Sequence, residues 1–262
     1  MKGTKIVKKS SYEKELIYTT LEKIRNEDVG DEVSVVGIVA VEPGVLASQY
    51  FYIVGSPGIQ IYMYKKDFPD LEIGDKVEVR GELSESGGEA RLKVSEKENI
   101  KKIGHVDIPQ PRVTEISEIG ETFEGWLIEI NGEITDMKGS YMYVDDGTDE
   151  IKVYFKRGAG INKDEFQEGD IVSVAGLVHQ TKSEYQLLPR FSEDIVKTGV
   201  VEEFVTKIEE QKQENVADLA EKYLTATAGG LTAIFVGLFT KSHGKKFRDF
   251  FRRITLWIKK RK

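Results

Sequence analysis

The sequence contains no cysteine, and only 3 histidines and 2 tryptophans occur in its 262 residues. The absence of cysteine excludes disulfide frameworks, thiolate zinc sites and cysteine nucleophiles. His105, His179 and His243 are too far apart in sequence for metal-ligand or catalytic-triad spacing. No glycine-rich phosphate loop is present either. We therefore predict a protein that is not an enzyme and that holds no metal or cofactor.

Positive charge is scarce in most of the chain and is concentrated at its C-terminal end. Residues 221–262 hold 11 basic and 2 acidic residues, which leaves 27 basic and 43 acidic residues, a net charge of −16, in residues 1–220. An acidic body disfavours long-range attraction to nucleic acid. A basic tail of net charge +9 instead predicts contact with an anionic membrane surface.

An internal repeat sets the architecture. Gly37 matches Gly132, and Gly81 matches Gly176, each 95 residues further along the chain. The pair Gly74-Asp75 matches Gly169-Asp170 at the same spacing, which indicates duplication of a whole domain and not a solenoid.

Each copy shows five segments in which apolar residues alternate with polar ones, with β-branched and aromatic residues enriched. The predicted strands are 33–41, 50–54, 59–64, 76–83 and 91–94 in the first copy, and 127–135, 141–144, 151–155, 171–178 and 185–188 in the second. One or two helical turns are expected between the third and fourth strands, at 67–75 and 161–170. The acidic run 145–150 lacks the spacing of a calcium loop and predicts a hairpin turn.

The glycine-kinked first strand, the hairpins FYI…GIQIY and YMYVDDGTDEIKVY, and the later GD-x-V-x-V-x-G resemble OB-fold domains. Such domains accompany secreted nucleases and serve as anticodon-binding modules in some tRNA synthetases. The chain looks especially similar to membrane-anchored tandem-OB surface proteins of candidate-phylum bacteria. The resemblance covers roughly residues 30–200 and implies a mainly β protein with two tandem five-stranded OB-type barrels. In contrast to those relatives, the chain shows no nuclease domain, no lamin-tail-like domain and no export signal.

The expected organisation has seven parts. They are an N-terminal extension (1–28), the first barrel (29–106), a linker (107–122), the second barrel (123–199), a helical stalk (200–222), a transmembrane or membrane-inserted helix (223–240) and a basic amphipathic helix (244–262).

The outward faces of the second and third strands are where OB barrels usually bind ligands. Alternation places tyrosines there, and base–aromatic stacking makes single-stranded nucleic acid the expected ligand. The candidate binding residues are Tyr50, Tyr52, Gln60, Tyr62, Tyr64, Lys65, Lys66, Tyr141, Tyr143, Lys152, Tyr154, Lys156 and Arg157, with Arg80, Lys93 and Arg190 as possible helpers. As alternatives, the tyrosines merely cover a sheet, or the barrels bind protein or glycan partners, which need no positive charge.

The C-terminal region predicts membrane attachment. Residues 223–240 carry no charge and would span about 27 Å as a helix, near the lower limit for a bilayer; a helix or hairpin buried against the barrels is the alternative. The last residues place aromatic and basic side chains on separate faces, as in interfacial helices; a basic arm for nucleic acid is the competing interpretation. The expected membrane-contacting residues are Phe235, Phe247, Phe250, Phe251, Ile254, Trp257, Ile258, Arg252, Arg253, Lys259 and Lys260.

The expected function is thus that of a membrane-tethered, non-catalytic binding protein. The positive-inside rule would keep the basic tail in the cytoplasm and the barrels outside. The N-terminal sequence MKGTKIVKKSSYEKELIY shows no apolar run of export-signal length. The sequence therefore leaves open which side of the membrane carries the barrels.

Overall fold

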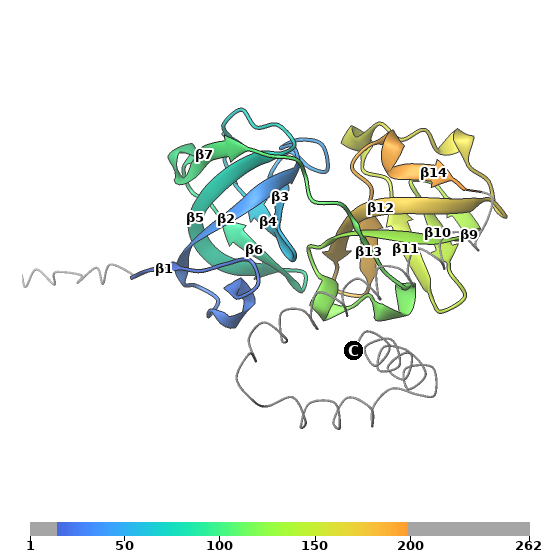
Figure 1. The fold of residues 1–262 in the computed structure, drawn as a ribbon, viewed down its shortest axis with the longest axis horizontal. Helices are drawn as coiled ribbons and strands as arrows, with labels where there is room; N and C mark the ends of the chain where they lie inside the picture. The colour runs from blue at the N-terminus through green and yellow to red at the C-terminus, as the bar shows by residue number, and fades with distance from the viewer. Residues whose placement is uncertain (1–14, 199–262) are drawn as a thin grey trace, which may run out of the picture. The chain divides into compact units, whose positions relative to one another are not determined.

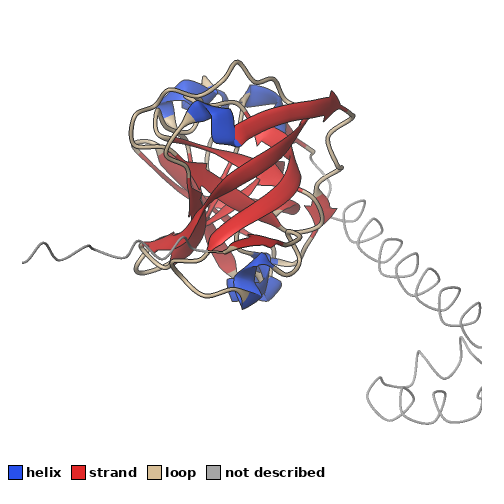
Figure 2. Cartoon of the chain, turned by 90° about the vertical axis from the view of Figure 1, so that its left-hand side faces the viewer, coloured by secondary structure: helices blue, strands red, loops and turns tan. Residues whose placement is uncertain are grey.

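A computed structural model describes residues 15–198 of the chain. These residues form two sheets of seven strands each, and each sheet closes on itself as a barrel (Figure 1). Strands and loops dominate, with short 3-10 turns between them (Figure 2). The predicted mainly β architecture with two tandem five-stranded barrels is confirmed.

The first sheet has the order β1-β2-β3-β4-β6-β5-β7, and an additional β2–β5 pairing closes the five central strands. The β4–β6 pair is parallel, whereas the other pairs of the closed barrel are antiparallel. Its strands are β1 (Leu16–Tyr18), β2 (Glu32–Val41), β3 (Tyr50–Val54), β4 (Gly58–Tyr62), β5 (Asp75–Ser86), β6 (Glu89–Lys93) and β7 (Ile100–His105).

The second sheet repeats this plan with the order β14-β12-β13-β11-β10-β9-β8, and a β12–β9 pairing closes it. Its strands are β8 (Arg112–Val113), β9 (Leu127–Lys138), β10 (Tyr141–Asp145), β11 (Glu150–Tyr154), β12 (Ile171–Gln180), β13 (Tyr185–Leu188) and β14 (Ile195–Lys197). The 3-10 turns are η1 (Ile24–Asn26), η2 (Lys97–Asn99), η3 (Ile116–Glu118), η4 (Glu121–Phe123), η5 (Arg157–Ala159), η6 (Lys163–Glu165) and η7 (Ser192–Asp194). Both barrels have the five-stranded Greek-key arrangement of an OB-type fold.

Alternation along the strands builds a separate core in each barrel. Phe51, Ile53 and Ile61 are fully buried in the first core, and Met142 and Val153 in the second. Strand residues between them point away from the barrel interior, because successive side chains project to opposite faces of a sheet. The alternation seen in the predicted strands therefore corresponds to these two cores.

Glycines inside the strands allow close packing of neighbouring strands. Gly132 has no positive φ, but a Cβ placed on it would lie 2.3 Å from the carbonyl oxygen of Asp145 on β10. Any side chain at Gly132 would thus push β9 and β10 apart at the point where the sheet coils.

Several segments differ from their predicted roles. Leu21 and Ile24 come from the expected N-terminal extension but are buried in the first core. Ile116 comes from the expected linker but is buried in the second core. Of the two expected helical turns, η6 is present, whereas residues 67–72 form no helix.

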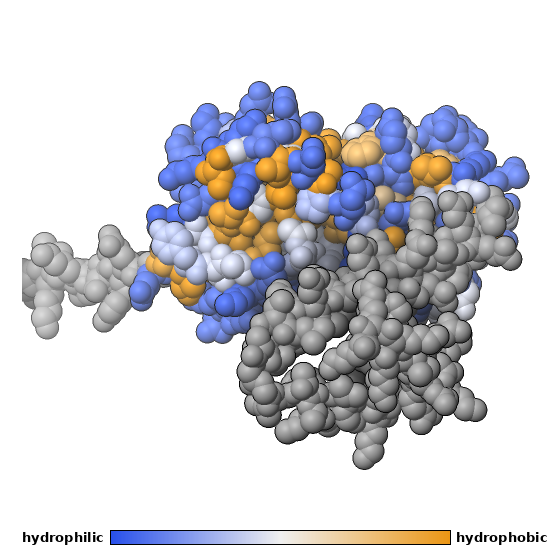
Figure 3. All heavy atoms as spheres, viewed as in Figure 1, coloured by the Kyte–Doolittle hydropathy of each residue, from blue (hydrophilic) through white to orange (hydrophobic). Residues whose placement is uncertain are grey.

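Apolar side chains reach the surface of the first barrel at several positions. Figure 3 shows apolar residues interspersed with hydrophilic ones over this barrel. Val36 on β2 and Ile103 on β7 are exposed, but β5 lies between their strands, and its Glu78 pairs in register with Val36. Isolated exposed apolar residues of this kind are normal on a soluble surface.

The predicted stalk, the membrane segment and the basic helix lie outside the described residues, as do all the expected membrane-contacting side chains. Within residues 15–198 there is no helix with the length and apolarity required to span a bilayer.

Asp75 locks the turn that enters β5 of the first barrel. Its buried carboxylate accepts hydrogen bonds from the Glu72 N–H (3.0 Å) and His105 Nδ1 (2.8 Å) and pairs with Lys102 (2.7 Å). Burial opposes ionisation, but the Glu72 N–H and the Lys102 and His105 side chains outweigh it and lower the pKa of Asp75 to about 2. Because the folded pKa lies below the ordinary one, this stabilisation is present above about pH 4 and is lost as the pH falls toward 2.

We expect Asp75→Asn to lower the free energy of unfolding at pH 7 by about 2 kcal/mol, since a charged, buried acceptor is removed. Urea unfolding at pH 7 and pH 3 measures the change, and the difference from wild type should shrink at pH 3. Asp170→Asn is the matched control, because Asp170 makes the equivalent bonds to Gln167 and Lys197 in a more exposed setting. An equal loss at both pH values would contradict the assigned role.

Candidate ligand-binding face

The same three-residue cluster stands on the outer face of both barrels. Tyr52 on β3 pairs in register with Gln60 on β4, and Glu89 lies at the start of the neighbouring β6. In the second barrel, Tyr143 on β10 pairs with Lys152 on β11. Glu184 directly precedes β13, the strand that pairs with β11.

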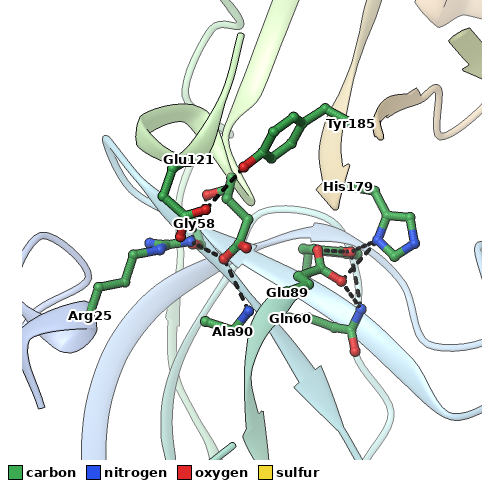
Figure 4. Close-up of polar contacts among 10 residues, drawn as sticks. Arg25, Gly58, Gln60, Glu89, Ala90, Glu121, His179 and Tyr185 are labelled. Carbon is green, nitrogen blue, oxygen red and sulfur yellow. Dashed lines mark hydrogen bonds and ion pairs between the residues drawn. The ribbon is translucent and has the colours of Figure 1, made fainter. Parts of the chain in front are cut away.

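The second barrel covers the cluster of the first. Tyr52 is 0% and Gln60 5% exposed. Tyr52 Oη donates to Glu89 Oε1 (2.6 Å), Gln60 Nε2 donates to Glu89 Oε2 (2.7 Å), and His179 Nδ1 from β12 lies 2.8 Å from Glu89 Oε2 (Figure 4). Burial raises the pKa of Tyr52 well above its usual value, and the negative charge of Glu89 raises it further. The predicted exposure of Tyr52 and Gln60 is therefore wrong, because their outer face packs against another barrel.

An apolar layer surrounds this polar cluster. Leu127, Leu177 and Leu188 of the second barrel pack against the outer face of the first. The buried residues of the first barrel in this layer are Ala40, Val41, Leu46, Tyr52 and Val54. The mixture of buried leucines with fully bonded polar groups makes the two barrels one packed body.

Further contacts fix the orientation of the barrels at the edges of this layer. Arg25 pairs with Glu124 (3.1 Å), and Glu124 Oε1 also accepts from the Ala90 N–H (3.1 Å). Burial raises the pKa of Glu124, and Arg25 opposes that shift. Arg190, a predicted helper for phosphate, is instead buried, ion-paired with Asp194 (2.7 Å) and bonded to the Ala40 carbonyl (3.2 Å).

The cluster of the second barrel is not covered by the first. Tyr141 and Tyr143 are half-buried, and their rings meet edge to face at 5.6 Å. Lys152 Nζ lies 5.1 Å from the centre of the Tyr141 ring and forms an ion pair with Glu184. The hydrogen bond to Glu184 raises the pKa of Lys152, and the same bond lowers that of Glu184. We name Tyr141, Tyr143, Lys152 and Glu184 the open tyrosine face.

Tyr154 extends this face toward the first barrel. It is the register partner of Tyr141, and Lys156 Nζ lies 5.0 Å from the centre of its ring. Burial lowers the pKa of Lys156. Arg157, just beyond, is exposed. Aromatic rings with cations beside them are the groups that can stack bases and meet phosphates.

The first barrel keeps part of its outer face exposed. Tyr62 is half-buried and pairs in register with Tyr50, which packs against the apolar layer between the barrels. Tyr64 is 76% exposed, Lys65 pairs with Glu96 (2.8 Å), and Lys66 is exposed in the turn after β4. The predicted residues of this barrel are thus divided between a covered part and an open part.

Sequence reasoning missed Arg91, Glu89 and Glu184. Arg91 Cζ lies 4.1 Å from the centre of the Tyr62 ring. Its place could have been found from alternation along β6, which lies beside β4. Glu89 and Glu184 are separated by the same 95 residues that relate the repeated glycines, so the repeat already contained this signal.

The acidic run of the second barrel forms a turn, as predicted. The Gly147 N–H donates to Asp145 Oδ1 (2.6 Å) and the Thr148 N–H to Asp146 Oδ1 (2.8 Å). The other oxygen of Asp146 accepts from the Ile116 N–H (2.7 Å). Among residues 15–198 there is no cluster of three potential metal-ligating side chains.

No protein-family model and no curated protein matches this chain. Solved structures with a similar fold include the S. pombe Stn1-Ten1 complex, at 16% identity and a TM-score of 0.35 over 44% of this chain and 99% of that one. The telomere capping protein Ten1 of S. pombe matches 40% of this chain and 99% of its own, at 12% identity and a TM-score of 0.31. A murine DNA-binding protein bound to double-stranded DNA matches 60% of this chain and 95% of its own, at 12% identity and a TM-score of 0.34.

Proposed function

We propose that the chain is a non-catalytic binding protein for single-stranded nucleic acid, with the open tyrosine face of the second barrel as its site. The observation that carries the proposal is the group formed by Tyr141, Tyr143 and Lys152 on the outer face of an OB-type barrel, a face that the first barrel does not cover. Bases stack on aromatic rings whatever their sequence.

Charge sets the expected strength of this binding. Residues 1–220 carry a net charge of −16, and Lys152 is already paired with Glu184. A phosphate must compete with that carboxylate, so stacking supplies most of the affinity. We expect dissociation constants of about 1–100 µM, in the range of non-specific nucleic-acid binding.

A protein partner is the second candidate, and one observation favours it. The equivalent cluster of the first barrel is occupied by protein, with His179 placed against Glu89. A partner that presents a basic side chain to Glu184 would use the open face in the same way. A glycan ligand has no comparable contact in its favour.

The proposal places the barrels at a membrane surface. Its support is the uncharged run 223–240 and the basic, aromatic residues 244–262 of the sequence. After gentle lysis, full-length protein is expected in the membrane fraction. Full-length protein recovered in the soluble fraction would contradict the tether.

The test of the ligand is a fluorescence titration of the full chain with single-stranded oligonucleotides of mixed sequence at low salt. Lys152→Gln introduces into the second barrel the residue that the first barrel has at the equivalent position, Gln60. Because one cation is removed, the slope of log affinity against log salt concentration should decrease in magnitude by about 0.7. Lys182→Gln, an exposed position just before β13, is the matched control and should leave the slope unchanged. Absence of binding throughout the micromolar range would reject nucleic acid as the ligand and leave the protein partner.

A further inference from the structure

The outer faces of the two barrels meet at a line that we call the seam, where Tyr50 of the first barrel and Tyr154 of the second pack against the same apolar layer. Burial raises the pKa of Tyr50, and so do the nearby Glu89 and Tyr154. These two tyrosines therefore lie close to one another, although they come from different barrels.

Register pairs continue the row of rings away from the seam on both sides. Tyr50 pairs across strands with Tyr62, and Tyr154 pairs across strands with Tyr141. Neighbouring strands lie about 5 Å apart, so adjacent rings in each pair are close enough for consecutive unstacked bases of one strand. The row Tyr62, Tyr50, Tyr154, Tyr141 thus crosses from one barrel to the other.

Cations accompany the row along its length. Arg91 lies over Tyr62 at 4.1 Å, Lys156 over Tyr154 at 5.0 Å, and Lys152 over Tyr141 at 5.1 Å. Arg91 keeps its guanidinium in place through a bond from Nε to Ser84 Oγ (3.3 Å). Among residues 15–198, Arg91 forms no ion pair that a phosphate would have to displace, whereas Lys152 is paired with Glu184. A guanidinium also suits bidentate phosphate contact.

We propose that Tyr50, Tyr62 and Arg91 form a second subsite, so that one nucleic-acid strand runs from the open tyrosine face across the seam onto the first barrel. This inference rests on the proposed function. The packing of the two barrels covers Tyr52 and Gln60. It also brings the exposed part of the outer face of the first barrel next to the open tyrosine face of the second. The chain then has one long site, occupied by one strand, in place of two separate sites.

Strand length tests the proposal. Fluorescence anisotropy on the full chain would compare single-stranded oligonucleotides of about 5 and about 20 nucleotides, because one OB barrel accommodates roughly 4–16 nucleotides. We expect the long strand to bind at least about 10-fold more tightly and with one strand per chain. The paired change Tyr62→Ala with Arg91→Ser should remove most of that advantage and leave short-strand binding within about 2-fold.

Controls separate this subsite from the proposed function. Tyr62→Phe retains the ring and should retain the length advantage, and Tyr18→Ala, at an exposed tyrosine on β1, should change neither affinity. Binding of neither strand to wild type would overturn the proposed function and the subsite together. Equal losses for both strands in the Tyr62/Arg91 variant, or a stoichiometry of two long strands per chain, would overturn the subsite alone.

Discussion

Replacing both Tyr141 and Tyr143 by alanine is expected to weaken binding of single-stranded oligonucleotides by about 100-fold. Each base–aromatic stack contributes roughly 1–3 kcal/mol, so two lost rings exceed the effect of any single cation at this face. Both side chains are half-buried on the outer face and point away from the core, so the barrel should remain folded. Titration by fluorescence anisotropy, with circular dichroism of each variant, gives the measurement.

Phenylalanine at both positions is the conservative control and should keep binding within a few fold of wild type, because stacking needs the ring and not the hydroxyl. If the alanine variant bound oligonucleotides as tightly as wild type while folded, the tyrosines would be a covering of the sheet and the ligand face would lie elsewhere.

Leu177→Glu is expected to destabilise the packing of the two barrels by about 3–5 kcal/mol, since it places an unpaired charge in an apolar layer. Leu177 is fully buried in the layer between the barrels and belongs to neither barrel's own core. The barrels should therefore separate before either one unfolds. Double electron–electron resonance between cysteines introduced at Val29 and Lys182 would report the separation, because the chain has no cysteine of its own.

Val36→Glu is the control for added charge, because Val36 is 41% exposed on the outer face of β2. It should change stability by less than about 0.5 kcal/mol. An unchanged distance distribution in the Leu177 variant would show that the polar contacts of Glu89 and Glu124 hold the barrels together without the leucines.

The sequence predicted the ten barrel strands because their alternation has a period of two that core packing requires. Val33, Val35 and Val39, for example, are buried in β2 as expected. The edge strands β1, β7, β8 and β14 were not predicted. Their segments are short or charged, as in Ile100–His105, where only Ile100 is buried. Such strands form because the backbone N–H and C=O groups of a neighbouring strand are available for hydrogen bonds. The alternation of apolar and polar residues within one segment does not show whether such a neighbour is present.

Only part of the candidate site could be predicted from the sequence, because alternation places a residue on one face of a strand but does not show what packs against that face. Alternation correctly placed Tyr52 and Gln60 on the outer surface of the first barrel, but it could not show that His179, 127 residues after Tyr52, lies against them. A leucine at an outward position of a strand, such as Leu177 between Ala175 and His179 on β12, could have indicated a covered outer face. Contacts between domains depend on shape and on both partners, so one strand's pattern carries little of that information.

The three leucines through which the second barrel packs against the first have no counterparts in the first barrel. Leu127, Leu177 and Leu188 are consecutive register partners across β9, β12 and β13. The equivalent partners across β2, β5 and β6 of the first barrel are Glu32, Glu82 and Lys93. At these register positions the first barrel therefore lacks the leucines with which the second barrel packs against it. A heterologous contact that repeats without closing would build fibres; the charged residues Glu32, Glu82 and Lys93 oppose such a repeat of the contact between the two barrels.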